Sequence, residues 1–202
     1  RAGLIVRHDD EAGFEDGTVD YLNLPAIDIG LRHLEQVGLD RIHERVRCLA
    51  GYLLDGMASL KHGNGRSMIH VHGPKNLDSR GATIALNVID PQGIPWDIGE
   101  IEDRAARVGI SLRSGCFCNP GVGEVIYGLS AEQIEELFHD ESLTFDCMRT
   151  RVRQRYGQEV GATRASLGIA TNFADVHRFL QFLEEFRDLD SGGTCPIVSI
   201  QC

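Results

Sequence analysis

The sequence is poor in positive charge, in long apolar runs and in regularly spaced cysteines. It holds 20 lysine and arginine residues against 30 aspartate and glutamate residues, which gives a formal net charge of −10. A surface of this sign repels the phosphates of nucleic acid, which argues against a nucleic-acid-binding protein. No apolar run approaches the roughly 18 residues that a membrane-spanning helix needs, so we expect no membrane segment.

The six cysteines indicate a reducing location. Their spacing is irregular, and 202 residues is long for a scaffold held together by disulfides, so we expect a cytoplasmic protein. Zinc sites combine a cysteine pair with a second pair or with spaced histidines, and neither pattern occurs, so we predict no metal site. His70 and His72 share one face of an expected strand, and we interpret them as part of a half-exposed strand.

Hydrophobic periodicity predicts helices interleaved with strands. A helical period bounded by glycine, proline or capping residues predicts helices over residues 26–37, 39–62, 96–109, 130–138, 145–156 and 172–189. Alternation of apolar and polar residues predicts strands over residues 67–73, 81–90, 110–115 and 164–171. We expect Cys48, beside the apolar stripe of the second helix, to pack in the core. In the last helix we expect these residues to point inward: Val176, Phe179, Leu180, Leu183 and Phe186.

This order of elements predicts an α/β sandwich of the α+β type, in which a short, mostly antiparallel sheet is covered by helices. Residues 1–25 are charged and contain glycine without any period, and we interpret them as a connecting arm. Residues 26–188 form the predicted domain. Residues 189–202 carry turn residues and little pattern, and are interpreted as a tail.

The segment RSGCFCNPG, residues 113–121, predicts an exposed loop that carries two thiols. Gly115 permits backbone conformations that other residues resist, and Pro120 with Gly121 turns the chain. A free cysteine is only about 3% thiolate at pH 7, and a neighbouring arginine raises that fraction. The segment therefore suits nucleophilic sulfur chemistry. On spacing alone, Cys116 and Cys118 are equally well explained as small hydrophobic residues that flank a buried Phe117.

Three segments, in order, resemble the PLP-dependent cysteine desulfurases, which are fold type I enzymes of the class V aminotransferase group. RSGCFCNPG is similar to their active-site loop, and most similar to the loop of the molybdenum-cofactor sulfurase branch. FEDGT at 14–18 resembles a Phe-Glu-x-Gly-Thr segment of the family. RASLGIATNFADVHRFLQFLEE at 164–185 resembles its Arg-x-Ser strand and final helix. The resemblance covers about residues 12–188 and implies the small C-terminal domain of such an enzyme.

The resemblance also implies roles for individual residues. Cys118 matches the cysteine that accepts sulfur from L-cysteine as a persulfide, and Cys116 is an additional thiol typical of the sulfurase branch. Arg164 matches the arginine that binds the substrate carboxylate, and Arg113 stands where a second substrate-side arginine is found. The segment containing Gly17 and Thr18 matches the one that reaches the PLP phosphate of the neighbouring subunit in the family's homodimer. The persulfide sulfur then passes to an acceptor, either a carrier protein or the molybdenum cofactor.

Lysine is scarce, and this limits what the chain does alone. PLP enzymes attach the cofactor to a lysine, which in this family follows a histidine upstream of the Phe-Glu-x-Gly-Thr segment. The chain has only Lys61 and Lys75, and neither has that setting. We therefore expect a fragment of a longer enzyme, inactive by itself. Two alternatives stay open: a class V aminotransferase or lyase relative without persulfide chemistry, and a non-catalytic redox or interaction domain.

Overall fold

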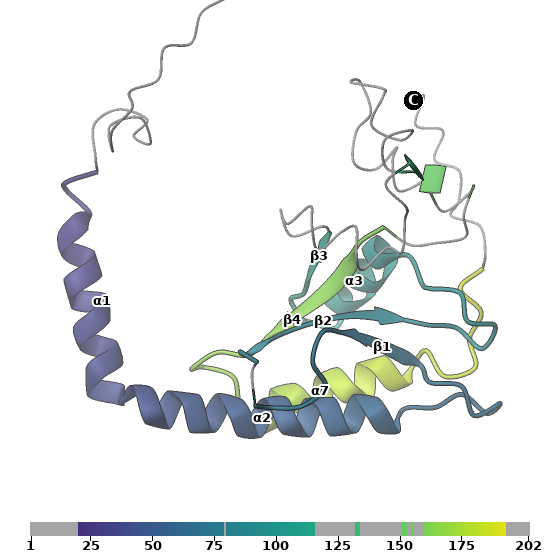
Figure 1. Cartoon of the computed structure of the whole chain (residues 1–202), viewed down its shortest axis with the longest axis horizontal. Coiled ribbons are helices and arrows are strands. Elements are labelled where there is room, and N and C mark those ends of the chain that lie inside the picture. The colour runs from purple at the N-terminus through teal and green to yellow at the C-terminus, as the bar shows by residue number, and fades with distance from the viewer. Residues whose placement is uncertain are drawn as a thin grey trace, which may run out of the picture. The chain divides into compact units, whose positions relative to one another are not determined.

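The computed structural model describes residues 20–78, 80–115, 132–133, 151–152, 155 and 160–192. The chain divides into two compact units, residues 1–43 and 44–202 (Figure 1). The boundary falls inside helix α2 (Leu39–Ser59). Among the described residues, no helix is long and apolar enough to cross a membrane.

In the first unit, the main described element is helix α1 (Leu24–Val37). Pro25 stands in its first turn, where the fixed backbone angle of proline and its missing N–H cost nothing. Gly38 ends the helix with a φ of 93°, a conformation that favours glycine, and its N–H donates to the Leu34 carbonyl. No residue of α1 is buried, although the helix is amphipathic.

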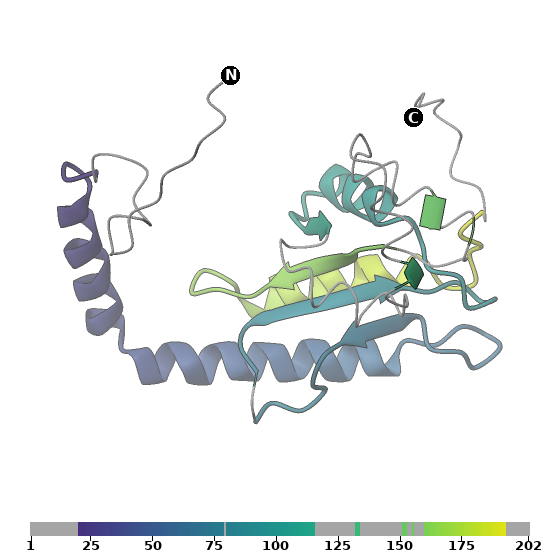
Figure 2. The ribbon, with the colours of Figure 1, turned by 45° about the horizontal axis from the view of Figure 1, so that its top comes forward.

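The second unit is built on a four-stranded sheet in the order β1-β2-β4-β3. The strands are β1 (Ile69–His72), β2 (Thr83–Val88), β3 (Arg113–Gly115) and β4 (Ala162–Ser166). All three pairings are antiparallel, which agrees with the predicted sheet. Figure 2 shows β1, β2 and β4 above α2, with α7 behind them.

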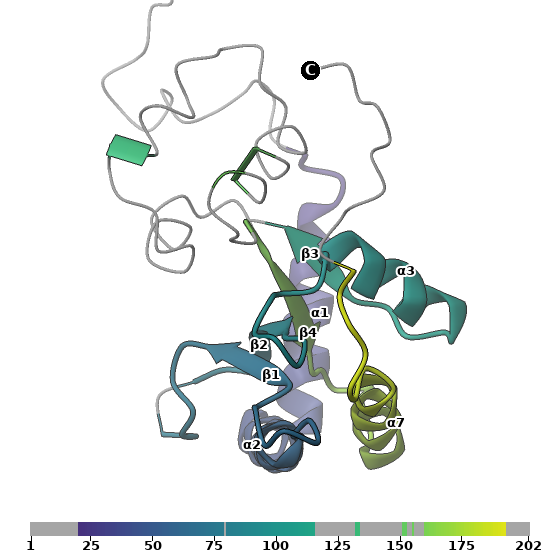
Figure 3. The ribbon, with the colours of Figure 1, turned by 90° about the vertical axis from the view of Figure 1, so that its right-hand side faces the viewer.

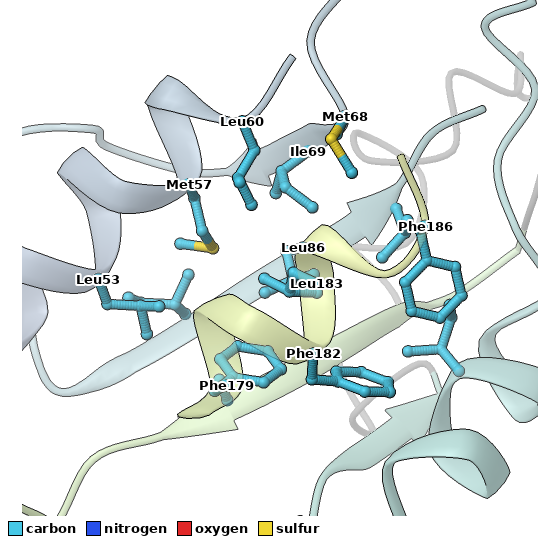
Figure 4. Packing of buried hydrophobic residues seen from close by; sticks show 14 of the residues in the cluster. Leu53, Met57, Leu60, Met68, Ile69, Leu86, Phe179, Phe182, Leu183 and Phe186 are labelled. Atoms are coloured by element: carbon cyan, nitrogen blue, oxygen red, sulfur yellow. The ribbon is translucent and has the colours of Figure 1, made fainter. Parts of the chain in front are cut away.

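Helices α2, α3 (Ile98–Arg107) and α7 (Phe173–Glu184) cover one face of this sheet (Figure 3). Leu86 of β2 is fully buried beneath them and belongs to the same apolar cluster as Leu53 and Met57 of α2, and Leu183 of α7 (Figure 4). Helix α3 joins this cluster through Ile101. The core therefore lies between the helices and a single face of the sheet.

Capping residues set the limits of the covering helices. Asp97 caps α3 by accepting from the Glu100 N–H, and Gly109, with a φ of 71°, follows its end. Asn172 and Asp175 form a capping box at the start of α7, with reciprocal bonds of 3.1 and 2.9 Å. Helix α7 approaches α2 at Gly56, where a side chain would collide with Leu180.

The predicted helices that fall on described residues are confirmed, with shifts of a few residues at their ends. The last strand differs from its prediction: β4 begins at Ala162 and ends at Ser166, because it pairs with both β2 and β3 over that range. The expectation for Cys48 is wrong, since this residue is exposed on the outer side of α2. The predicted helices at 130–138 and 145–156 lie largely outside the described residues.

Candidate functional site

The second face of the sheet carries four residues that the sequence singled out, which are His70, His72, Arg113 and Arg164. Side chains alternate along a strand, so residues that pair across strands share a face. The pairings His72↔Ala85, Ala85↔Arg164 and Arg164↔Arg113 place four residues in one row across all four strands. His70 and Asn87 pair beside this row. We call these six residues the arginine face. Helices α2, α3 and α7 lie on the opposite face of the sheet (Figure 3).

Arg113 and Arg164 are directly opposed on β3 and β4. Opposed residues of an antiparallel pair have Cα atoms about 4.5–5.5 Å apart, and like charges at such positions repel each other. An anion between two guanidinium groups relieves that repulsion and is bound through their fork of N–H donors. Arg164 is half-buried, which strengthens its attraction for a carboxylate, whereas Arg113 is exposed.

Ser114, the residue after Arg113, faces the helices. Its hydroxyl donates to the Ile98 carbonyl at 3.2 Å and lies 3.5 Å from the Thr163 hydroxyl. These contacts tie β3 to the start of α3 and to β4. Strand β3 therefore has a fixed register, which fixes Arg113 opposite Arg164.

Gly161 and Gly115 lie where β4 begins and β3 ends. Gly161 has a φ of 124°, and a Cβ there would be 2.5 Å from the Ile98 Cδ1 and 3.4 Å from the Gly115 carbonyl oxygen. A larger residue at Gly161 would therefore strain its backbone and push the Ile98 side chain aside. Gly115, with a φ of 132°, likewise requires glycine at the last residue before Cys116.

At the β1 end of the arginine face, two histidine rings meet edge to face at 4.7 Å between centroids. His72 Nε2 is 2.5 Å from Asn87 Oδ1, and Asn87 Nδ2 donates to the Gly161 carbonyl at 3.1 Å. Burial, followed by the neighbouring His72 and Lys75, lowers the pKa of His70. His70 and His72 thus share a half-exposed strand, as predicted, and no group of three or more metal-ligating side chains occurs in the described part of the chain.

The structure brings together two of the predicted site residues, Arg113 and Arg164. Cys116, Cys118, Gly17 and Thr18 lie outside the described residues, and their roles stay predictions. Sequence reasoning missed Asn87, which is 7% exposed and joins His72 to Gly161. Its signal was a polar residue within an apolar strand.

Neither lysine is placed to hold PLP. Lys61 follows the end of α2, is exposed and pairs with Ser67 in an isolated bridge. Lys75 is exposed in the bend after β1. A lysine that forms an imine must lose its proton, which burial favours and exposure does not. The described residues therefore fit the recognition of a substrate carboxylate and do not fit covalent attachment of the cofactor.

Comparison with known proteins identifies relatives along nearly the whole chain. No family model matches it. The chain is 31% identical over 189 residues to the molybdenum cofactor sulfurase of Homo sapiens, covering 91% of this chain and 21% of that protein. It is 29% identical over 187 residues to that of Solanum lycopersicum, covering 93% and 22%. For Drosophila mojavensis the identity is 34% over 181 residues, covering 84% and 22%. The chain thus spans about a fifth of the length of these relatives.

A solved apo structure of a cysteine desulfurase from Thermococcus onnurineus NA1 shares the fold. The TM-score is 0.54 at 20% identity, and the match covers 87% of this chain and 33% of that one. The fold is therefore that of a cysteine desulfurase-like α+β domain, as predicted. The chain is a homologue of the molybdenum cofactor sulfurases, which confirms the resemblance that its motifs indicated.

Proposed function

We propose that this chain is the C-terminal part of a PLP-dependent sulfurase-type enzyme that takes sulfur from L-cysteine. The observation that supports this most directly is the pairing of Arg164 with Arg113 across β4 and β3. These are the two arginines that the resemblance assigns to the substrate. They are far apart in the sequence and adjacent in the fold.

The arginine face binds the α-carboxylate of the amino acid in this proposal. Arg164 supplies a planar fork of N–H donors that matches the two carboxylate oxygens. Arg113 adds a second positive charge from the neighbouring strand. The bonds of Ser114 to Ile98 and Thr163 hold that strand in register. The amino acid is thereby oriented relative to the loop that begins at Cys116.

Cys118 is the nucleophile in this proposal. Its thiolate attacks the sulfur of the bound cysteine, so that an S–S bond forms on Cys118 as the C–S bond of the substrate breaks, and alanine is the product. The resulting persulfide then passes its outer sulfur to an acceptor, the molybdenum cofactor or a carrier protein. Cys116, two residues away in the sequence, supplies a second thiol.

PLP supplies the electron sink for this cleavage when it is bound. Its attachment lysine comes from outside the 202 residues, because Lys61 and Lys75 do not fit that role. By resemblance, Gly17 and Thr18 would hold the cofactor phosphate of a partner subunit in a homodimer. The part played by this chain is to bind the substrate and to accept its sulfur.

Mass spectrometry of the full-length, PLP-loaded protein tests the proposal. After incubation with L-cysteine, we expect the Cys118 peptide to gain the mass of one sulfur atom and to lose it on reduction. Cys118→Ala should abolish the release of sulfide and alanine. Cys48→Ala is the matched control, since Cys48 is an exposed free cysteine on α2, and it should retain full activity. Turnover of cysteine that survives Cys118→Ala would favour an aminotransferase or lyase relative.

A further inference from the structure

The histidine end of the arginine face has a fixed geometry that the proposed function does not use. A carbonyl only accepts hydrogen bonds, so the bond to the Gly161 carbonyl requires the Asn87 nitrogen at that position. The Asn87 oxygen must then be the atom that faces His72 at 2.5 Å. His72 therefore donates from Nε2, and its neutral ring carries the proton there.

This bond leaves Nδ1 as the proton-accepting atom of His72. No described residue forms a hydrogen bond with Nδ1, and the ring is half-buried. The carbonyl that orients Asn87 belongs to Gly161, whose own conformation is held between Ile98 and Gly115. The orientation of the His72 ring is thus set by the same packing that sets the start of β4.

His72 and Arg164 lie in the same row, with Ala85 between them. Neighbouring strands are about 4.8 Å apart, so the Cα atoms of His72 and Arg164 are separated by about 10 Å. Both side chains project from the same face, and the intervening Ala85 is short. This separation suits a small α-amino acid with its carboxylate on Arg164 and its side chain toward His72.

We propose that His72 recognises the side-chain thiol of the amino acid whose carboxylate is bound by Arg164, and accepts its proton at Nδ1. The inference deepens the proposed function and rests on it. The proton leaves as the Cys118 thiolate bonds to the substrate sulfur: the S–S bond forms, the C–S and S–H bonds break, the S–H electron pair stays on the outer persulfide sulfur, and the proton forms an N–H bond that makes the ring an imidazolium. Asn87 acts as a positioning residue that keeps Nε2 as the donor.

The charged groups that face His72 are known from each neighbouring element. On β1 this is His70, which is itself affected by Lys75 in the bend after the strand, and across the face they are Arg164 and Arg113. The ring of His70 contacts His72 edge to face, and its lowered pKa favours the neutral form. His70 therefore borders the proton acceptor without adding a cation at neutral pH.

Replacing His72 by glutamine separates its proposed role as proton acceptor from its hydrogen bond to Asn87. In His72→Gln the side-chain amide keeps an N–H donor for Asn87 and lacks an acceptor at the place of Nδ1. In the full-length, PLP-loaded enzyme we expect kcat for L-cysteine to fall by about 10²-fold or more. His177→Gln is the control and should stay within about three-fold, since His177 is exposed on α7, bonds to Tyr52 and is not part of the arginine face. His72→Ala should regain activity with added imidazole, in proportion to its concentration.

The alternative is that His72 only satisfies the buried amide of Asn87. In that case His72→Gln would turn over cysteine at the wild-type rate and imidazole would not rescue His72→Ala, and either result overturns the inference while leaving the proposed function intact. Absence of cysteine turnover by the wild-type enzyme would overturn the proposed function and the inference together.

Histidine ¹⁵N NMR of the 202-residue chain provides a readout independent of activity. We expect the neutral His72 ring to show the Nε2–H tautomer, and Asn87→Leu to yield a mixture of tautomers. A neutral His72 with its proton on Nδ1 in the wild-type chain would overturn the inference, because the proposed acceptor atom would then be occupied.

Discussion

Helices α1 and α7 are amphipathic and of similar length, yet they differ completely in burial. Helix α1 has 14 residues and buries none of them, and Ile27 and Leu31 are 58% and 55% exposed. Helix α7 has 12 residues and its apolar side is packed against the sheet, with Leu183 fully buried. A helical period therefore predicts a helix in both places, but it does not tell what covers the helix.

The difference also separates two sources of helix stability. Most helical stability in proteins comes from packing of the apolar side, and short helices without it are marginal. Helix α7 has that packing and a capping box at Asn172, whereas Asn23 at the start of α1 makes no capping bond. The second unit supplies the rigid support of the arginine face in the described part of the chain.

Removal of a buried leucine should produce the largest contrast between the two helices. Leu183→Ala on α7 deletes methyl groups from the closed core and should lower the free energy of unfolding by about 2–5 kcal/mol. Leu31→Ala on α1 should change it by less than about 0.5 kcal/mol, because that side chain is exposed. Urea denaturation of both variants measures the difference. Equal losses would mean that α1 is packed in solution.

The free energy of unfolding should depend on pH through Asp90, which follows β2 and accepts hydrogen bonds from Ser191 after α7. Burial alone would raise the pKa of Asp90, but hydrogen bonds from Ile94, Ser191 and Gln92 outweigh burial and hold the pKa of its carboxyl below the ordinary value. Because the folded state binds this proton more weakly, the stabilisation is complete above the ordinary aspartate pKa of about 3.9 and is lost as pH falls through the lower folded value.

Asp90→Asn provides the test of that contribution. It replaces the carboxylate that accepts from Ser191 Oγ at 2.8 Å and from the Ile94 N–H at 2.8 Å. We expect a loss of about 1–3 kcal/mol at pH 6 and a smaller loss at pH 3. Urea midpoints at the two pH values measure it, and a loss that does not vary with pH would remove Asp90 as the titrating group.

Capping should give the smallest contrast. Asn172→Ala removes the side-chain acceptor of the Asp175 N–H and should cost about 1 kcal/mol. Asn23→Ala is the matched change on α1, where the asparagine side chain donates to Asp20 and caps nothing, and it should be near neutral. Thermal unfolding of the two variants distinguishes them. A larger effect at Asn23 would reverse the comparison.

The sequence predicted the helices of the second unit well because their apolar residues recur at three- and four-residue steps. It predicted an inward Leu180, which packs against the core where α7 meets α2 at Gly56, but it did not include Phe182, which is buried as well. Cys48 was predicted to be buried because it lies beside the apolar stripe of α2. It is exposed, because a residue beside such a stripe can point away from the core.

The sequence predicted the site only in part, because the register between neighbouring strands cannot be derived from the pattern within one strand. Motifs singled out Arg113 and Arg164 separately, but their direct pairing is a property of the sheet and follows from the register of β3 on β4. The contacts of His72 with Asn87, and of Asn87 with Gly161, join residues distant in sequence. Periodicity within one strand carries no information about such contacts.

The affinity of the full-length, PLP-loaded enzyme for L-cysteine tests most directly whether the arginine face binds the substrate. Arg164→Gln removes hydrogen bonds to a charged carboxylate, worth about 1.5–3 kcal/mol, and should raise KM by about 10- to 100-fold. Arg107→Gln, at the exposed end of α3, is the control and should leave KM unchanged. A KM for Arg164→Gln equal to that of the wild type would contradict the account.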